Sequence, residues 1–178
     1  MILLTGPSAS GKTEIAKELF KLFGIKKVVT HTTRDMRVGE VQDVDYHFVS
    51  KEEFLKLKDE DAFVETTFYN NNYYGTSKKE LGNDKVIVVD PKGKDSFLKL
   101  NNPNNIFFYI EANAELRKAR MIERGDNDDC IRQRLLRDES WFDDEAKIGV
   151  NFIVENENKT LEEIAKEIYN MYIEKIRD

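Results

Sequence analysis

The sequence contains one cysteine, no long apolar run and no excess of positive charge. With Cys130 alone no intrachain disulfide can form, and a reducing compartment is the natural setting for the chain. No apolar run approaches the length of a membrane span. The first four residues lead directly into a glycine motif, so we expect neither a signal peptide nor a membrane partner. These absences predict a cytoplasmic protein.

The charge balance disfavours one class of nucleic-acid-binding protein. The formal net charge of -6 and the isoelectric point near 5.2 disfavour a protein that coats nucleic acid, although a local basic cluster can still bind a small anion. The hydrophobic fraction of 40% is sufficient for a core and argues against disorder. His31 and His47 have no cysteine or carboxylate at ligand spacing, so we expect no metal site there.

Short apolar runs alternate with amphipathic segments along most of the chain. Strands are predicted at 1–5, 28–29, 63–68, 86–89, 106–110 and 152–154, with a turn at 70–72. Helices are predicted from 13 to 24, after Ser50, from 114 to 124, onward to about 142 after a break at 125–127, and after Thr160. This alternation indicates an α/β fold of three layers around a parallel sheet, interrupted by a small inserted lobe between 30 and 75.

A glycine-rich loop follows the first predicted strand. Its sequence is Gly6-Pro7-Ser8-Ala9-Ser10-Gly11-Lys12-Thr13, which fits the G-x-x-x-x-G-K-[ST] pattern in full. Glycines let successive N–H groups face a phosphate, and the following helix adds its positive end. The Lys12 ammonium would reach the β- and γ-phosphates, while the Thr13 hydroxyl would ligate magnesium. A chance match is disfavoured because the pattern lies between a predicted strand and a predicted helix. The loop predicts binding of ATP with Mg²⁺.

A second anion site is suggested by the segment 30–40. Arg34 and Arg37 stand three residues apart among hydroxyl side chains, with Tyr46 soon after. Two guanidinium groups and hydroxyls suit a dianionic phosphate. On these residues alone, an exposed loop with two solvated arginines is an equal alternative.

The order of motifs resembles that of the guanylate kinases. A Gly-Pro-Ser phosphate loop is followed by Thr32-Thr33-Arg34 through Glu40, then by 45–50 (DYHFVS) and 72–76 (NYYGT). The similarity covers nearly the whole chain. It implies a P-loop kinase fold with a central parallel sheet, a core at 1–30 and 78–178, a GMP-binding lobe at about 31–77, and a helical lid at about 120–140.

The resemblance also implies residue roles. Those expected at the GMP phosphate and base are Thr30, Arg34, Arg37, Tyr46, Glu65, Tyr74, Thr76 and Asp90. Those expected to act in catalysis are Lys12, Arg34, Arg120, Arg124 and Arg134. Magnesium would be held by Thr13, with Asp90 acting through water.

Chemistry supports the guanine assignment. Guanine presents adjacent N–H donors that the Glu65 carboxylate can accept as a pair, whereas adenine does not, and such a site can reject a mismatched ligand by ~10⁴-fold. Without the resemblance, Glu65 would be an exposed strand residue, Asp90 a surface loop residue, and Arg120 and Arg124 part of a solvated helix face. Arg137 follows these arginines along the chain and could be either a lid residue or part of such a solvated face.

Three positions depart from the family pattern. Val88 stands where the family has an aspartate, Glu123 where the lid has a glycine, and Asn156 one residue later than the family's asparagine. The expected activity is ATP-dependent phosphorylation of GMP, and of dGMP, to the diphosphate. A kinase of another small phosphate, such as ribose bisphosphate, and a non-catalytic interaction module are the alternatives. The sequence sets no oligomeric state.

Overall fold

The computed structural model describes residues 1–69 and 71–177; Asn70, part of the turn predicted at 70–72, lies outside them. The chain divides into two compact units. The first comprises Met1–Lys27 and the described residues from Asn83 onward, and the second is Val28–Gly82. Each is described by itself.

The first unit is built on a five-stranded parallel sheet with the strand order β2-β7-β1-β8-β9. Its strands are β1 (Ile2–Thr5), β2 (Lys26–Lys27), β7 (Lys85–Val88), β8 (Ile106–Glu111) and β9 (Phe152–Glu155). Its helices are α1 (Lys12–Phe23), α3 (Pro91–Leu98), α4 (Ala114–Glu123), α5 (Asp128–Trp141) and α6 (Leu161–Lys175), with a 3₁₀ turn η2 (Asp144–Lys147). The predicted α/β architecture with a central parallel sheet is confirmed.

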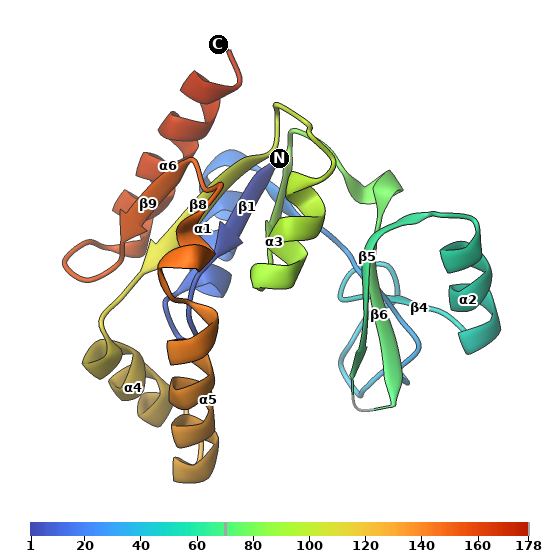
Figure 1. The fold of residues 1–178 in the computed structure, drawn as a ribbon, viewed down its shortest axis with the longest axis horizontal. Coiled ribbons are helices and arrows are strands. Elements are labelled where there is room, and N and C mark those ends of the chain that lie inside the picture. The colour runs from blue at the N-terminus through green and yellow to red at the C-terminus, as the bar shows by residue number, and fades with distance from the viewer. Residues whose placement is uncertain (70, 178) are drawn as a thin grey trace. The chain divides into compact units, whose positions relative to one another are not determined.

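The core of this unit lies between the sheet and the pair α1 and α6. Ile15 and Leu19 of α1 and Ile168 of α6 are fully buried against alternate residues of the central strands, such as Ile2 and Leu4. Helix α3 covers the opposite face through buried Phe97, so the sheet is sandwiched between helices (Figure 1). Burial on both faces explains why the central strands read as continuous aliphatic runs.

The second unit holds a four-stranded sheet in the order β4-β3-β6-β5 and one helix, α2 (Lys51–Asp59). The strands are β3 (His31–Thr32), β4 (His47–Phe48), β5 (Phe63–Tyr69) and β6 (Asn72–Ser77), and a 3₁₀ turn η1 (Lys78–Glu80) follows. Phe54 of α2 stacks on Phe63 at 4.6 Å and on Tyr73 at 5.3 Å. Gly75 makes this approach possible, because a Cβ there would lie 3.0 Å from both phenylalanine rings.

Most predicted elements are confirmed, with two differences. The strand predicted at Val28–Val29 is wrong: pairing with β7 occurs at Lys26 and Lys27, and the chain enters the second unit from Val28. Helix α3 was not predicted from the sequence. It begins at Pro91, and its N-cap is Asp90, whose carboxylate accepts the Gly93 N–H.

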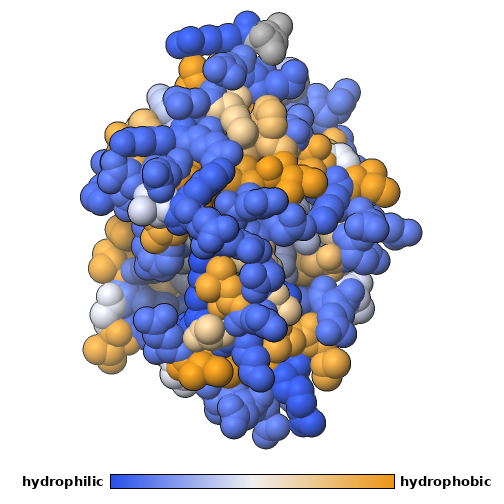
Figure 2. All heavy atoms as spheres, turned by 90° about the vertical axis from the view of Figure 1, so that its left-hand side faces the viewer, coloured by the Kyte–Doolittle hydropathy of each residue, from blue (hydrophilic) through white to orange (hydrophobic). Residues whose placement is uncertain are grey.

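The surface agrees with the high content of charged residues. Figure 2 shows a face on which hydrophilic side chains dominate and apolar side chains form separate groups. Within the described residues, no helix combines the length and apolar character that crossing a membrane requires.

Candidate active site

The glycine loop lies at the carboxyl end of the central strand β1, where ligands bind in open α/β sheets. Gly6 has φ +137°, and a Cβ there would lie 2.3 Å from the Ile110 carbonyl oxygen. Gly11 has φ +101°, and its Cβ would lie 2.2 Å from Asn156 Nδ2. Ala9, at φ +58°, is also left-handed. The loop therefore lies tightly against the Ile110 backbone and the Asn156 side chain, with glycine at the two positions that tolerate no side chain.

Lys12 folds back over the loop. Its Nζ donates to the carbonyl oxygens of Gly6 and Pro7, each at 2.6 Å, and to Ser10 Oγ at 3.2 Å. Burial lowers the pKa of Lys12 to about 8, with Asp138 opposing and Arg117 reinforcing that shift. These three acceptor oxygens are uncharged, so an anionic oxygen would be a stronger acceptor for this ammonium.

A hollow of about 490 Å³ adjoins the loop. It is lined by Ala9, Gly11, Lys12, Thr13, Glu14, Arg120, Arg124, Asn156, Lys159 and Leu161. The predicted residues Lys12, Thr13, Arg120 and Arg124 are thus brought together at one site. Lys159 precedes α6, and Leu161 is its first residue. Neither of these two residues was predicted from the sequence.

Arg120 has different hydrogen-bond partners from Arg124 and Arg134, the other arginines of the predicted lid. Its guanidinium donates to the Ala9 carbonyl at 3.2 Å and to the Asn156 carbonyl at 3.1 Å. The buried Asn156 side chain donates in turn to the Ser10 carbonyl at 2.7 Å. The asparagine that stands one residue late in the sequence therefore contacts the phosphate loop.

Arg124 and Arg134 meet at Asp126. Arg124 Nε donates to Asp126 at 2.9 Å, and Arg134 Nη1 donates to the same carboxylate at 3.2 Å. The hydrogen bond from Arg124 lowers the pKa of Asp126 and raises that of Arg124. Helix α4 ends at Glu123, so Arg124 is its C-cap and has different partners from Arg120.

A buried ion pair behind the loop was missed from sequence. Asp138 of α5 accepts hydrogen bonds from the Ser8 N–H at 2.8 Å, from Ser8 Oγ at 3.1 Å and from Arg117 at 2.9 Å. Arg137, predicted only as an ambiguous member of the row, donates to Ser8 Oγ at 3.2 Å and lies over the Trp141 ring.

Magnesium requires few protein ligands when phosphates and water supply the rest. Thr13 provides a hydroxyl in the first turn of α1, at the edge of the hollow. The Asp90 Oδ1 atom caps α3, and its second oxygen does not take part in that cap. This donor set fits a magnesium ion that is carried mainly by a triphosphate.

In the second unit, Arg34 is held among aromatic rings and a carboxylate. It donates to both oxygens of Glu40, at 3.0 and 2.7 Å, and its guanidinium lies 5.4 Å from the Tyr46 ring centre. Tyr46 and Tyr74 meet edge to face at 6.3 Å. Glu40 also accepts the Arg37 N–H at 2.7 Å, and the hydrogen bond from Arg34 lowers the pKa of Glu40. The Arg37 side chain is exposed.

The predicted base-reading residues lie on the paired strands β5 and β6. Glu65 and Thr76 are opposite each other, and the Thr76 hydroxyl donates to the Glu65 carboxylate at 2.6 Å. Tyr74 is two residues from Thr76, so both project from the same face of β6. Thr30 offers its carbonyl to the His47 N–H. Asp90 belongs to the first unit, whereas the other predicted GMP residues belong to the second.

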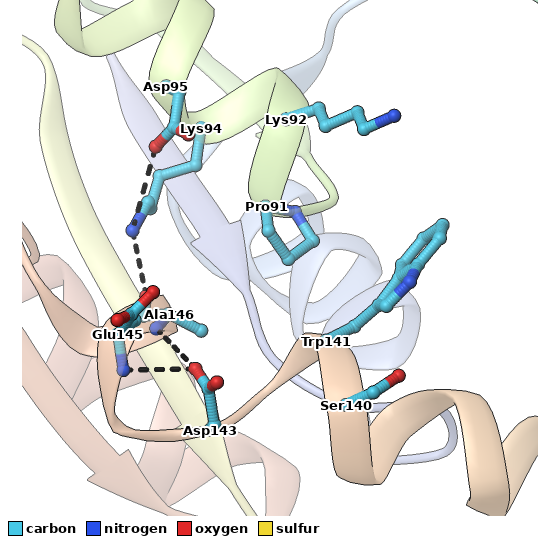
Figure 3. Close-up of a pocket in the computed structure, with 9 residues that line it drawn as sticks. All are labelled: Pro91, Lys92, Lys94, Asp95, Ser140, Trp141, Asp143, Glu145 and Ala146. Carbon is cyan, nitrogen blue, oxygen red and sulfur yellow. Dashed lines mark hydrogen bonds and ion pairs between the residues drawn. The ribbon is translucent and has the colours of Figure 1, made fainter.

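A further hollow of about 300 Å³ lies between α3 and the connection that follows α5 (Figure 3). Lys94 is buried at its edge and donates to the carbonyl oxygens of Ala146 and Ile148 at 2.9 and 2.8 Å. Lys92 and Trp141 project into open space, as the close-up shows. None of the lining residues was predicted for the site. The hydrogen bonds of Lys94 connect α3 to the 3₁₀ turn η2 and the residue after it.

Comparison with known proteins places this geometry in a family. The guanylate kinase family profile matches residues 1–175. The guanylate kinase of Schizosaccharomyces pombe is 36% identical, over 92% of this chain and 88% of that protein. The guanylate kinase of Pseudomonas fluorescens is 33% identical, over 76% of this chain and 69% of that protein. The crystal structure of guanylate kinase from Anaplasma phagocytophilum matches 98% of this chain and 84% of its own, with a TM-score of 0.67 and 22% identity, which supports the fold. The chain belongs to the guanylate kinase family.

Proposed function

We propose that this chain transfers the γ-phosphoryl group of ATP to GMP, and to dGMP, giving ADP and the nucleoside diphosphate. The observation that carries the proposal is a row of neighbouring side chains in the second unit. Arg34 lies on Tyr46, Tyr46 meets Tyr74, and Tyr74 shares its face of β6 with Thr76, the partner of Glu65. A cation therefore lies at one end for a phosphate, and a carboxylate at the other for a guanine.

The site residues keep the roles expected from the sequence. Arg34, Arg37, Tyr46 and Tyr74 would hold the GMP phosphate, while Thr30, Glu65, Thr76 and Asp90 would hold the base. ATP would occupy the hollow of about 490 Å³ beside Lys12. The second unit would act as the GMP-binding lobe, close to the predicted range 31–77, and α4 with α5 would act as the lid.

The reaction requires no protein nucleophile. An oxygen of the GMP phosphate attacks the γ-phosphorus in line, and the bond from that phosphorus to the β–γ bridging oxygen breaks. Lys12, Arg120, Arg124 and Arg134 supply positive charge where charge is spread over the transferred group, and one well-placed arginine can contribute ~10³-fold in rate. Magnesium, held by Thr13 and through water by Asp90, would add charge neutralisation on the β- and γ-phosphates.

An ADP-release assay with ATP, magnesium and each of GMP, dGMP, AMP, UMP and CMP tests the proposal. We expect turnover only with GMP and dGMP. Lys12→Ala and Arg34→Ala should each reduce kcat/KM by about 10²-fold or more, because each removes a charge that faces phosphate. Lys166→Ala, which removes an exposed lysine paired with Glu162 on α6, is the matched control and should retain activity.

The two alternatives predict different outcomes. A kinase of ribose bisphosphate would turn over that substrate and leave GMP unused. A non-catalytic interaction module would turn over neither, and the intact Lys12 and Thr13 argue against it. We also propose a cytoplasmic location, which rests on the single free cysteine.

A further inference from the structure

Ser8, the third residue of the phosphate loop, does not present its amide to the site. Its N–H is 2.8 Å from Asp138 Oδ2, and its hydroxyl is 3.1 Å from Asp138 Oδ1. Its carbonyl accepts from Arg117 at 3.4 Å. The N–H, the hydroxyl and the carbonyl of this one residue are thus all bound by the two members of a buried ion pair.

Both members of the ion pair are buried. Asp138 is 2% exposed and Arg117 is 8% exposed. Arg117 is oriented by a further hydrogen bond, from its Nε to the Ala112 carbonyl at 3.2 Å. A buried carboxylate with several donors is fixed in position, because any movement would leave a charge without partners.

The next residue explains what the ion pair stabilises. Ala9 has φ +58°, a left-handed conformation that is unfavourable for a residue with a Cβ. The Arg120 guanidinium donates to the Ala9 carbonyl at 3.2 Å, so this residue too is held by an arginine of α4. A left-handed residue in such a loop turns successive N–H groups toward one point, which makes an anion-binding nest.

We propose that Asp138 is a positioning residue for ATP, which acts by holding Ser8 and thereby keeping Ala9 left-handed before the nucleotide binds. Arg117 holds Asp138, and the pair joins α4 and α5 to the phosphate loop. The nest is then already formed when ATP arrives, so ATP binding does not have to supply the ordering of the loop. The inference rests on the proposed function only in taking ATP as the ligand.

Nucleotide titration of the full chain tests this inference without an acceptor. Asp138→Asn retains the size of the side chain but removes the charge, and we expect the Kd for ATP to rise about 10-fold or more. Ala9→Gly removes the steric cost of the left-handed conformation. We expect it to recover about threefold to fivefold of the lost affinity in the Asp138→Asn background, and to give a smaller gain in the wild-type background. In turnover, Asp138→Asn should raise KM for ATP by a larger factor than it lowers kcat.

Lys94→Met is the control for a purely structural effect. It removes the ammonium of a residue that is 3% exposed in the same unit. The hydrogen bonds of Lys94 go to the carbonyl oxygens of Ala146 and Ile148, away from the phosphate loop. We expect lower stability with unchanged affinity for ATP, with all titrations made at a temperature at which each variant is folded by circular dichroism.

Three results would overturn the positioning role: wild-type affinity in Asp138→Asn, an equal loss of affinity in Lys94→Met, or equal gains from Ala9→Gly in both backgrounds. If the wild-type chain phosphorylates no monophosphate while this pattern of affinities holds, the proposed acceptor is wrong and the role of Asp138 stands.

Discussion

At the scale of single residues, we expect specificity for guanine to depend on Glu65 and its contact with Thr76. The carboxylate accepts the threonine hydroxyl and is expected to accept two guanine N–H groups. Glu65→Gln replaces one acceptor oxygen by an NH₂ donor. We expect kcat/KM for GMP to fall by about 10²-fold, because a charged hydrogen bond is lost and a donor faces a donor. Steady-state assays that vary GMP will measure the change.

Affinity for ATP is the internal control for this variant, since the phosphate loop belongs to the other unit. We expect the Kd for ATP to be the same in Glu65→Gln and in the wild type. Unaltered kcat/KM for GMP would show that the carboxylate does not read the base.

We expect His31 to make folding stability depend on pH. Burial lowers its pKa, and the neighbouring His47 ring at 4.5 Å adds to the shift, whereas Glu80 and Asp43 oppose it and Lys79 reinforces it. The folded state therefore disfavours the protonated ring, so unfolding takes up a proton as the pH falls below the ordinary histidine pKa of about 6.5. Stability should decrease as the pH falls below that value.

His31→Phe tests this dependence. The ring already packs edge to face against Phe63 at 5.3 Å, and the buried Nδ1 atom has no hydrogen-bond partner within the described residues. We expect urea unfolding of the variant to lose less stability than the wild type between about pH 7 and pH 5. Equal losses in both proteins would assign the dependence to other groups.

Site residues that belong to a recognisable motif were predicted from the sequence. Residues whose contacts depend on tertiary packing were not. Lys12 and Arg34 stand in recognisable spacings. Asp138 is one acid among many in a charged helix, and only the packing of α5 behind the loop brings it to Ser8. Glu40 was noticed as part of a motif, but its contact with Arg34 depends on the loop conformation.

At the scale of elements, Gly75 lies where Phe54 of α2 packs on the β5–β6 hairpin. Gly75→Ala would place a methyl group 3.0 Å from the rings of Phe54 and Phe63, which have little room to move. We expect a loss of about 1–3 kcal/mol in the stability of this unit, because overpacking forces the rings apart.

Calorimetry and GMP kinetics will measure the effect of Gly75→Ala. Because Tyr74 and Thr76 flank the glycine, KM for GMP should rise, whereas the Kd for ATP should not change. A weaker affinity for ATP would mean that the damage is not confined to the second unit.

The predictability of each element follows from its length and pattern. Helices α1 and α6 carry apolar residues at helical spacing and clear end signals, including the Thr160–Glu163 capping box. Strands β2, β3 and β4 have two residues each, too few to display a period. Helix α3 is short and contains Gly93, so its helical pattern is weak in the sequence. Asp90 followed by Pro91 is nevertheless a helix-start signal that could have predicted it.

At the scale of the whole molecule, the division into two units predicts that the two substrates stabilise different parts of the chain. ATP at 100 times its Kd should add ~2.7 kcal/mol to the stability of the state that binds it. We expect hydrogen exchange to slow around β1 and α1 with ATP, and around β5 and β6 with GMP. Slowing by GMP in β1 alone would contradict this assignment.

The contacts of α4 and α5 have a mechanical consequence. Both helices lie side by side (Figure 1), and Arg117, Arg120 and Asp138 bind them to the loop at Ser8 and Ala9. The turn between the helices instead carries the Arg124–Asp126–Arg134 cluster. We therefore expect the two helices to rotate about their contacts with the phosphate loop, so that the turn between them moves furthest. If the helices close over a bound nucleotide, a probe on exposed Cys130, near the turn, should be displaced further than the Trp141 indole at the other end of α5.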